Sequence, residues 1–121
     1  HLRLHGDCHP ATLLWTDTGP HFVDLDDART GPAVQDLWML ASDDDAVDAL
    51  LEGYAQLRDF DPRERALIPA LRAMRQVQWA GWIAERWHDP AFPAAFPFAA
   101  EASWWERHVE DLNEAAEKLD Q

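Results

Sequence analysis

The sequence predicts an α+β fold that is predominantly α-helical, in which a short β-hairpin comes first and about four helices follow. Two short apolar runs surround a turn-forming segment early in the chain, which is the pattern of a hairpin. After Gly31 and Pro32, apolar residues recur at helical spacing. The chain has 121 residues, of which 47% are hydrophobic, and this is enough for one compact domain with its own core.

The hairpin is predicted within residues 12–25. Residues 12–15 and 21–25 are the two apolar or β-branched runs, and the turn formers Thr-Asp-Thr-Gly-Pro occupy residues 16–20 between them. The preceding residues 5–10 have no periodicity and are predicted to form a loop.

The first two helices are predicted over residues 33–41 and from Ser42 to about Arg58. Residues 33–41 are apolar on most sides, which is typical of a buried helix. Ser42 is the expected N-cap of the second helix, because a hydroxyl there can accept a hydrogen bond from the first turn. The three aspartates that follow it suit the positive end of the helix dipole.

A third helix is predicted to begin at Asp61 and to run to about Trp87. Asp61 is the expected cap residue and Pro62 the expected first helical residue. Pro69 predicts a kink inside this helix, because proline removes one backbone hydrogen bond.

The C-terminal part is predicted to contain a packed loop over residues 89–98 and an amphipathic helix over residues 103–119. Five tryptophans in this region have two interpretations, core packing between helices or a platform for a cationic group of a substrate. Their spacing across two helices favours packing. They are Trp79, Trp82, Trp87, Trp104 and Trp105.

The charge balance excludes some partners. With 10 basic and 23 acidic side chains, the net charge is −13, which argues against nucleic acid and anionic membranes as partners. A cationic partner or a divalent metal remains compatible with it. The sequence has no apolar run of about 18 residues, so no membrane span is expected. The single cysteine, Cys8, excludes an internal disulfide, fits the reducing cytoplasm and is expected to be a small packed side chain.

Three aspartates are candidates for chemistry because of their positions. Asp7 lies in the loop before the hairpin, Asp24 at the end of its second strand, and Asp36 inside the first apolar helix. Because a hairpin brings its two outer ends together, Asp7 and Asp24 are expected to lie near each other. Two such carboxylates can bind a divalent cation, or divide into a general base and a metal ligand. The alternative is a solvated acidic turn without chemistry.

Several short motifs follow one another in a fixed order. They are His5-Gly6-Asp7-x-His9-Pro10, a strand–turn–strand, Val23-Asp24-Leu25-Asp26, Gly31-Pro32 and Asp36-Leu37. This order resembles the catalytic half of the aminoglycoside phosphotransferase and choline kinase group, which shares the protein-kinase-like fold. Residues 22–29 and 31–40 look most like the bacterial stress-response serine/threonine protein kinases of that group. A weaker likeness extends through the terminal helix, so the resemblance covers essentially the whole chain.

The resemblance implies a role for each motif. Asp7 matches the catalytic base that accepts the proton of the attacking hydroxyl, and Asp24 matches the metal-binding aspartate. His5 matches a histidine that supports the catalytic loop, and Asp36 matches a helix aspartate that binds backbone amides of that loop. Asp26 is expected either to support the metal-binding residue or to bind a second metal ion. The implied cofactors are Mg²⁺ and ATP, and the implied reaction is transfer of the γ-phosphoryl group to a serine or threonine hydroxyl of a protein.

The sequence departs from the family pattern in two respects. The family has a metal-binding asparagine five residues after the catalytic aspartate, usually preceded by glycine, whereas this chain has Ala11 and Thr12 there. We expect this change to weaken the second metal contact and catalysis. In addition, no glycine-rich phosphate cover is present, and Lys118, the only lysine, lies in the last helix.

These departures lead to an expected domain organisation. Residues 1–121 are expected to be the large C-terminal lobe of a kinase-like fold, with the small N-terminal lobe as a missing partner. Within it, residues 1–32 are expected to hold the catalytic loop and the metal-binding hairpin, and residues 33–121 the helical subdomain. The isolated chain is expected to be inactive.

Two other functions stay open at this point. One is a small-molecule kinase that acts on an aminoglycoside, choline or a sugar-like alcohol, for which the acidic balance is suitable. The other is a pseudokinase or truncated lobe that acts as a binding module, which Ala11 and Thr12 favour.

Overall fold

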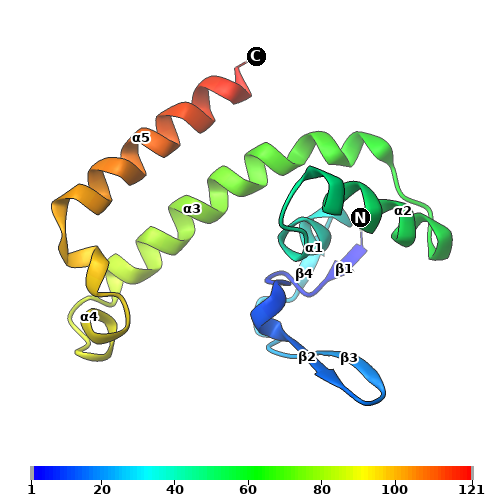
Figure 1. The fold of residues 1–121 in the computed structure, drawn as a ribbon, viewed down its shortest axis with the longest axis horizontal. Coiled ribbons are helices and arrows are strands. Elements are labelled where there is room, and N and C mark those ends of the chain that lie inside the picture. Colours follow the sequence, from blue (N-terminus) through cyan, green and yellow to red (C-terminus); the bar gives the residue numbers. More distant parts are fainter. Residues whose placement is uncertain (1, 121) are drawn as a thin grey trace. The chain divides into compact units, whose positions relative to one another are not determined.

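The computed structural model describes residues 2–120 and confirms an α+β fold that is predominantly helical (Figure 1). Contacts divide the chain into two compact units, His1–Ile68 and Pro69–Gln121. The first unit holds the strands and the motifs of the candidate site, and the second is built from helices. The expected assignment of residues 1–32 and 33–121 to catalytic and helical parts concerns their roles and stays a prediction.

The predicted hairpin is present in the first unit. Strand β2 (Leu13–Thr16) pairs antiparallel with β3 (Gly19–Phe22), with Leu13 opposite Phe22. The second strand ends at Phe22 rather than at residue 25. Extended pairing stops there because Asp24, two residues later, has a left-handed backbone with φ +62°.

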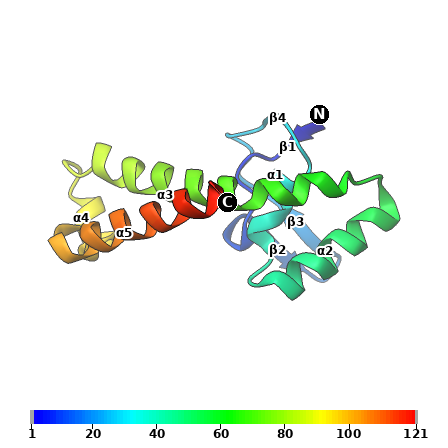
Figure 2. The same ribbon diagram turned by 90° about the horizontal axis from the view of Figure 1, so that it is seen from above.

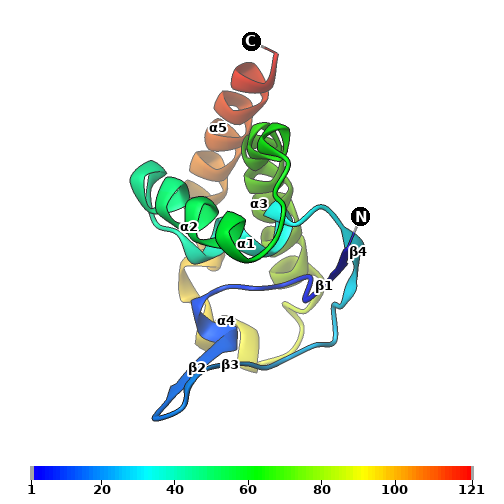
Figure 3. The ribbon, with the colours of Figure 1, turned by 90° about the vertical axis from the view of Figure 1, so that its right-hand side faces the viewer.

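A second small sheet was not predicted from the sequence. Strand β1 (Leu2–Leu4) pairs antiparallel with β4 (Arg29–Gly31), and Figure 3 shows the two strands side by side. A Cβ at Gly31 would lie 2.8 Å from Leu4 Cδ1 and 2.9 Å from Gln35 Oε1, so these two side chains would have to shift to admit it. This sheet joins the two ends of the segment that carries Asp7 and Asp24.

The helix predicted over residues 33–41 is a short α-helix, α1 (Val34–Leu37), followed by a 3₁₀ turn, η2 (Trp38–Leu40). The expectation that this helix is buried holds only for its start. Ala33 and Val34 are buried, whereas the other residues of α1 and η2 are half-buried.

The second helix, α2 (Asp44–Leu57), was predicted with nearly correct bounds but with the wrong cap. Asp43, and not Ser42, is the N-cap, since its carboxylate accepts a hydrogen bond from Ala46 N at 2.7 Å. Asp43 has the extended backbone of an N-cap residue, so its carboxylate reaches the first turn.

The third predicted helix begins as a six-residue 3₁₀ helix, η3 (Pro62–Leu67), and continues as α3 (Ile68–Glu85). The predicted cap is confirmed, because Asp61 accepts a hydrogen bond from Arg63 N at 3.0 Å and Pro62 is the first residue of η3. Pro69 is the second residue of α3, where a backbone N–H has no partner within the helix. Proline is therefore tolerated there as part of a helix start, and not as a kink in a helix interior.

The predicted loop over residues 89–98 is wrong, because this segment forms α4 (Ala91–Ala95) and leads into the 3₁₀ turn η4 (Pro97–Ala100). Asp89 helps α4 to start, since its carboxylate accepts a hydrogen bond from Ala91 N at 3.0 Å. The terminal helix α5 (Ala102–Leu119) agrees with the prediction. Figure 2 shows α4 beside the start of α5.

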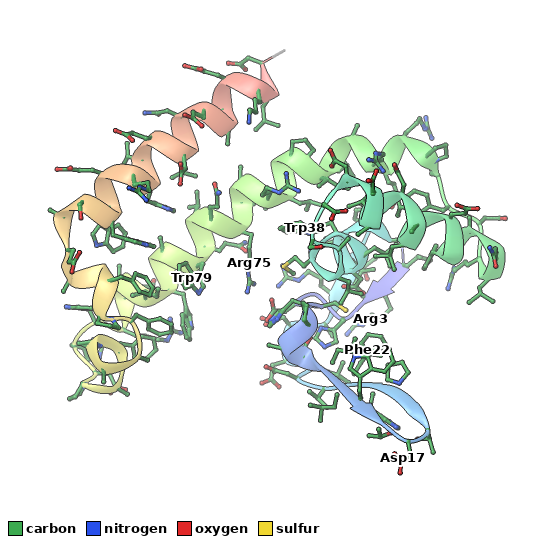
Figure 4. The ribbon with its side chains drawn as sticks, viewed as in Figure 1. Arg3, Asp17, Phe22, Trp38, Arg75 and Trp79 are labelled. Carbon is green, nitrogen blue, oxygen red and sulfur yellow. The ribbon has the colours of Figure 1, made fainter. Side chains whose placement is uncertain are left out.

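Aromatic side chains cluster at the α4 end of the second unit, which supports the packing interpretation of the tryptophans only in part, because Trp79 and Trp82 stay exposed. Trp79 points from α3 toward the α4 side (Figure 4) and stacks on Phe98 with ring centroids 5.8 Å apart. Trp105 Nε1 donates a hydrogen bond to the Ala99 carbonyl at 2.7 Å. Ile83, on α3, is completely buried. Four of the five tryptophans of this region make ring contacts with described residues, and the fifth, Trp87, makes none with them.

No helix within residues 2–120 is both long enough and apolar enough to cross a membrane.

Candidate functional site

Asp36 anchors the loop that precedes the hairpin. Its carboxylate accepts a hydrogen bond from His5 N at 2.7 Å and another from Gly6 N at 3.0 Å. Both bonds are charge-assisted and join residues about thirty positions apart, so they fix the loop against α1. This is the arrangement expected for a helix aspartate that binds loop amides.

Gly6 allows the loop to pass close to the segment after the hairpin. Its φ is +92°, and a Cβ at this position would lie 2.0 Å from the Asp27 carbonyl oxygen. No L-residue with a side chain fits such a contact without moving one of the two backbones. Gly6 therefore brings the loop of Asp7 and the bend after Asp24 into direct backbone contact.

His5 connects the same two segments through its ring. Its Nδ1 accepts a hydrogen bond from Asp7 N at 3.2 Å, and its Nε2 lies 2.6 Å from the Val23 carbonyl oxygen. Because Nδ1 is the acceptor, Nε2 carries the proton in a neutral ring and donates it to Val23. A second bond, from Val23 N to the Thr12 carbonyl at 2.9 Å, joins the segments again. Hydrogen bonds thus join the segment of Asp7 to the segment of Asp24 at residues that neighbour the two aspartates.

The Asp7 carboxylate is largely shielded from solvent and contacts a second histidine. Its Oδ2 lies 3.4 Å from His9 Nε2, and the two side chains are 20% and 24% exposed. The role of catalytic base, which the family resemblance implies for Asp7, stays a prediction. His9 was not assigned a role from the sequence, although its position two residues after Asp7 and before a proline was a usable signal.

Asp24 has a strained backbone and an accessible carboxylate. It is the only non-glycine among residues 2–120 with positive φ, and such a conformation costs roughly 1–2 kcal/mol for most residues. Strain of this kind is found preferentially at functional sites. The side chain is exposed and makes no hydrogen bond or ion pair with any described residue.

The residues present fit a magnesium ion, but only one that is shared with a ligand. Among residues 2–120, no group of three or more His, Cys, Asp or Glu side chains converges on a point where it could hold a metal. Mg²⁺ commonly uses one or two carboxylates and takes its other oxygens from water and substrate phosphates. Asp24 offers such a carboxylate, and Asp26, which is also exposed, follows two residues later.

Thr12 occupies the position of the expected family asparagine, and its hydroxyl is engaged inside the loop. The side chain is buried, and Oγ1 accepts a hydrogen bond from His9 N at 3.2 Å. The same oxygen lies 2.9 Å from the His9 carbonyl and 3.3 Å from the Asp7 carbonyl. Thr12 therefore braces the turn that follows Asp7, which is a different use of this position from metal binding.

Cys8 is buried between the loop and α1, in agreement with the expectation of a packed side chain. Burial, together with the negative charges of Asp36 and Asp7, raises the pKa of the Cys8 thiol above its usual value. A thiol in this environment stays protonated and is a poor nucleophile. The chemistry of the site thus rests on its carboxylates and histidines.

Comparisons with known proteins identify relatives of the chain. The model of a family described as "Phosphotransferase enzyme family" matches residues 1–68, which coincide with the first unit. "Stress response kinase A" of Escherichia coli (strain K12) is 50% identical to the chain over 123 aligned residues, covering 98% of the chain and 37% of that protein. "Serine/threonine protein kinase RdoA" of Salmonella typhimurium (strain LT2) is 50% identical over 113 residues, covering 89% of the chain and 34% of that protein. The chain therefore spans little more than a third of the length of these relatives.

Proposed function

Because the chain belongs to the phosphotransferase enzyme family, we propose that it supplies the catalytic loop and the metal-binding residue of an ATP-dependent kinase. The proposed substrates are serine or threonine hydroxyls of proteins, and the proposed setting is a bacterial stress response in the cytoplasm. The names of two relatives, a stress response kinase and a serine/threonine protein kinase, support this choice of substrate. The buried free Cys8 is compatible with a reducing compartment.

The observation that carries the proposal is the anchored loop. Asp36 holds the backbone of His5 and Gly6, and His5 in turn joins Asp7 to the segment of Asp24. Phosphoryl transfer demands little covalent chemistry from the protein, so catalysis depends on positioning and on charge stabilisation. The loop of Asp7 is fixed to α1 through Asp36 and to the segment of Asp24 through His5. The two carboxylates therefore have defined positions, which meets this demand.

In the proposed reaction, Asp7 orients the substrate hydroxyl and receives its proton. The hydroxyl oxygen forms a bond to the γ-phosphorus of ATP, the bond between that phosphorus and the bridging oxygen of ADP breaks, and ADP leaves with the electron pair. Asp24 would hold Mg²⁺, which neutralises negative charge on the phosphates when it is bound. His5 and Asp36 keep the two carboxylates in place and do not touch the reacting atoms.

The decisive test is a pair of isosteric variants in the complete natural protein that contains these residues. Asp7→Asn is expected to lower kcat by about 10²- to 10⁴-fold, because the amide cannot accept the proton. Asp24→Asn is expected to raise the Mg²⁺ concentration needed for half-maximal rate. Asp17→Asn, at the exposed tip of the hairpin (Figure 4), is the matched control and should leave both quantities unchanged. A wild-type rate for Asp7→Asn would rule out the proposed base.

One observation favours a second candidate, a kinase that acts on a small cationic alcohol. The net charge of −13 suits an amino-alcohol substrate as well as a basic protein segment. A comparison of phosphate transfer to a protein mixture and to a panel of aminoglycosides, choline and sugar alcohols separates the two. Absence of transfer to both, together with absence of magnesium-dependent ATP binding by calorimetry, would instead indicate a binding module.

A further inference from the structure

We propose that His9 is a positioning residue for the Asp7 carboxylate, because the turn after the loop fixes one ring nitrogen of His9 and directs the other toward Asp7. The inference rests on the proposed function only in taking Asp7 as the base. Neither the sequence motifs nor the comparisons assign a role to His9.

The two ring nitrogens of His9 have different partners. Nδ1 accepts a hydrogen bond from Ala11 N at 3.3 Å, so this nitrogen carries no proton. In a neutral ring the proton is then on Nε2, which lies 3.4 Å from Asp7 Oδ2. The protonated nitrogen is therefore the one that lies nearer the carboxylate, at a distance longer than that of an ordinary N–H···O hydrogen bond. Catalytic hydrogen bonds are often this long without substrate and shorten when substrate binds.

The backbone of His9 is held as firmly as its ring. His9 is the N-cap of η1 (Pro10–Thr12), and a reciprocal capping box closes this turn, with His9 N donating to Thr12 Oγ1 at 3.2 Å. Thr12 N also donates to the His9 carbonyl at 2.9 Å, and Pro10 restricts the first residue of the turn. The Thr12 side chain is buried, so the turn is attached to the interior of the unit.

This geometry has a chemical consequence for Asp7. A carboxylate can rotate about its Cβ–Cγ bond, and a base that rotates freely meets the substrate hydroxyl in the correct orientation only part of the time. A hydrogen-bond donor on one carboxylate oxygen restricts that rotation. His9 achieves this from a fixed turn, whereas a long flexible side chain would lose more conformational entropy.

A role as a simple helix cap is the alternative, and two substitutions separate the roles. Asn is a good N-cap residue whose side chain is too short to reach Asp7, so His9→Asn keeps the cap and removes the contact. Gln places an amide nitrogen about as far along the side chain as His9 Nε2 but is not a favoured cap. His9→Gln therefore keeps the contact with Asp7 and weakens the cap. The exposed His21, on β3, gives the matched control His21→Asn.

The experiment measures kcat, the KM for ATP and the urea midpoint of these three variants in the complete natural protein. We expect His9→Asn to lower kcat roughly tenfold to a hundredfold, with the KM and the midpoint unchanged. His9→Gln should recover part of that kcat despite a lower midpoint, and His21→Asn should retain the wild-type kcat. A wild-type kcat for His9→Asn, or a kcat that follows the urea midpoint across the series, would overturn the proposal.

A second measurement does not depend on activity. Nitrogen-15 NMR of the histidine rings is expected to show His9 Nδ1 without a proton and Nε2 with one, and Asp7→Ala is expected to shift the Nε2 resonance. A proton on Nδ1, or no response of Nε2 to Asp7→Ala, would overturn the proposed geometry. If the wild-type protein transfers no phosphate at all, the proposed function fails, and these resonances still decide whether His9 positions Asp7.

Discussion

Gly6 lies where the loop of Asp7 contacts the bend at Asp27. Its positive φ and its close approach to another backbone segment can be tested separately. Its φ is +92°, and a Cβ there would lie 2.0 Å from the Asp27 carbonyl oxygen. Gly19 also has a positive φ, of +115°, but nothing lies within 4 Å of the position of its Cβ. Substitution of Gly19 therefore measures the cost of the positive φ alone, and substitution of Gly6 measures that cost together with the cost of the close backbone contact.

We expect Gly19→Ala to lower the free energy of unfolding by about 1–2 kcal/mol, which is the cost of a left-handed alanine. Gly6→Ala should cost about 3 kcal/mol or more, because the methyl group also forces two backbone segments apart. Urea unfolding followed by tryptophan fluorescence gives both values. Equal losses would mean that the contact between Gly6 and Asp27 is not tight in solution.

Cys8 provides a test of the electrostatics behind the catalytic loop. Burial and the charges of Asp36 and Asp7 raise the pKa of the thiol, so the folded protein binds this proton more tightly than the unfolded chain does. The resulting stabilisation is complete below the ordinary thiol pKa and is lost as the pH rises through the folded pKa. Wild-type protein should therefore lose more unfolding free energy than Cys8→Ala between about pH 8 and pH 10.

Iodoacetamide gives an independent measurement on the same residue. Native Cys8 is expected to react much more slowly at pH 8 than the thiol of the urea-unfolded chain, because the side chain is buried and protonated. Similar rates in both states would contradict the raised pKa and the burial together.

The start of α2 tests which of two adjacent polar residues caps the helix. Asp43→Ala should lower the free energy of unfolding by about 1 kcal/mol, because the hydrogen bond from Ala46 N loses its acceptor. Ser42→Ala is the matched control and should change it by less than about 0.5 kcal/mol. Thermal or urea unfolding of both variants decides this, and a larger effect for Ser42 would restore the cap predicted from the sequence.

Among the elements, those with local signals could be predicted from the sequence. The hairpin β2–β3 was recognisable because its turn formers lie within a few residues of the strands they join, and the Asp61–Pro62 cap was recognisable for the same reason. The pairing of β1 with β4 was not, because two three-residue strands with more than twenty residues between them carry no periodic signal. The segment 89–98 was missed because its prolines and phenylalanines suggested a loop, although proline is compatible with the first turn of a helix.

The candidate site shows the same limit. Its motif order pointed to Asp7, Asp24 and Asp36, and the structure adds the contacts that only a folded chain can show. The close approach of Gly6 to the Asp27 carbonyl and the hydrogen bond from Val23 N to the Thr12 carbonyl join residues that are far apart in the sequence and meet only in the folded chain. The position of His9, two residues after Asp7 and before a proline, was a usable signal, but which partners its two ring nitrogens have could be seen only in the folded chain.

The charge of the whole chain leads to a prediction about substrate recognition. The net charge is −13, and three consecutive exposed aspartates, Asp43–Asp45, lie at the start of α2 in the first unit. A surface with one dominant sign of charge attracts ligands of the opposite sign over distances of about a Debye length, which is roughly 10 Å in 0.1 M salt. A basic peptide substrate should therefore bind more weakly as salt shields this attraction.

The measurement uses the complete natural protein and compares two peptide substrates with the same acceptor serine. One peptide has arginines beside the serine and the other has glutamines. Between about 0.05 M and about 0.5 M salt, the KM of the arginine peptide is expected to rise about threefold or more, while its kcat stays constant, because screening acts on encounter and not on the reacting atoms. The KM of the glutamine peptide should change little. If both KM values change by the same factor, the acidic surface does not select the substrate, and specificity must come from contacts at the site itself.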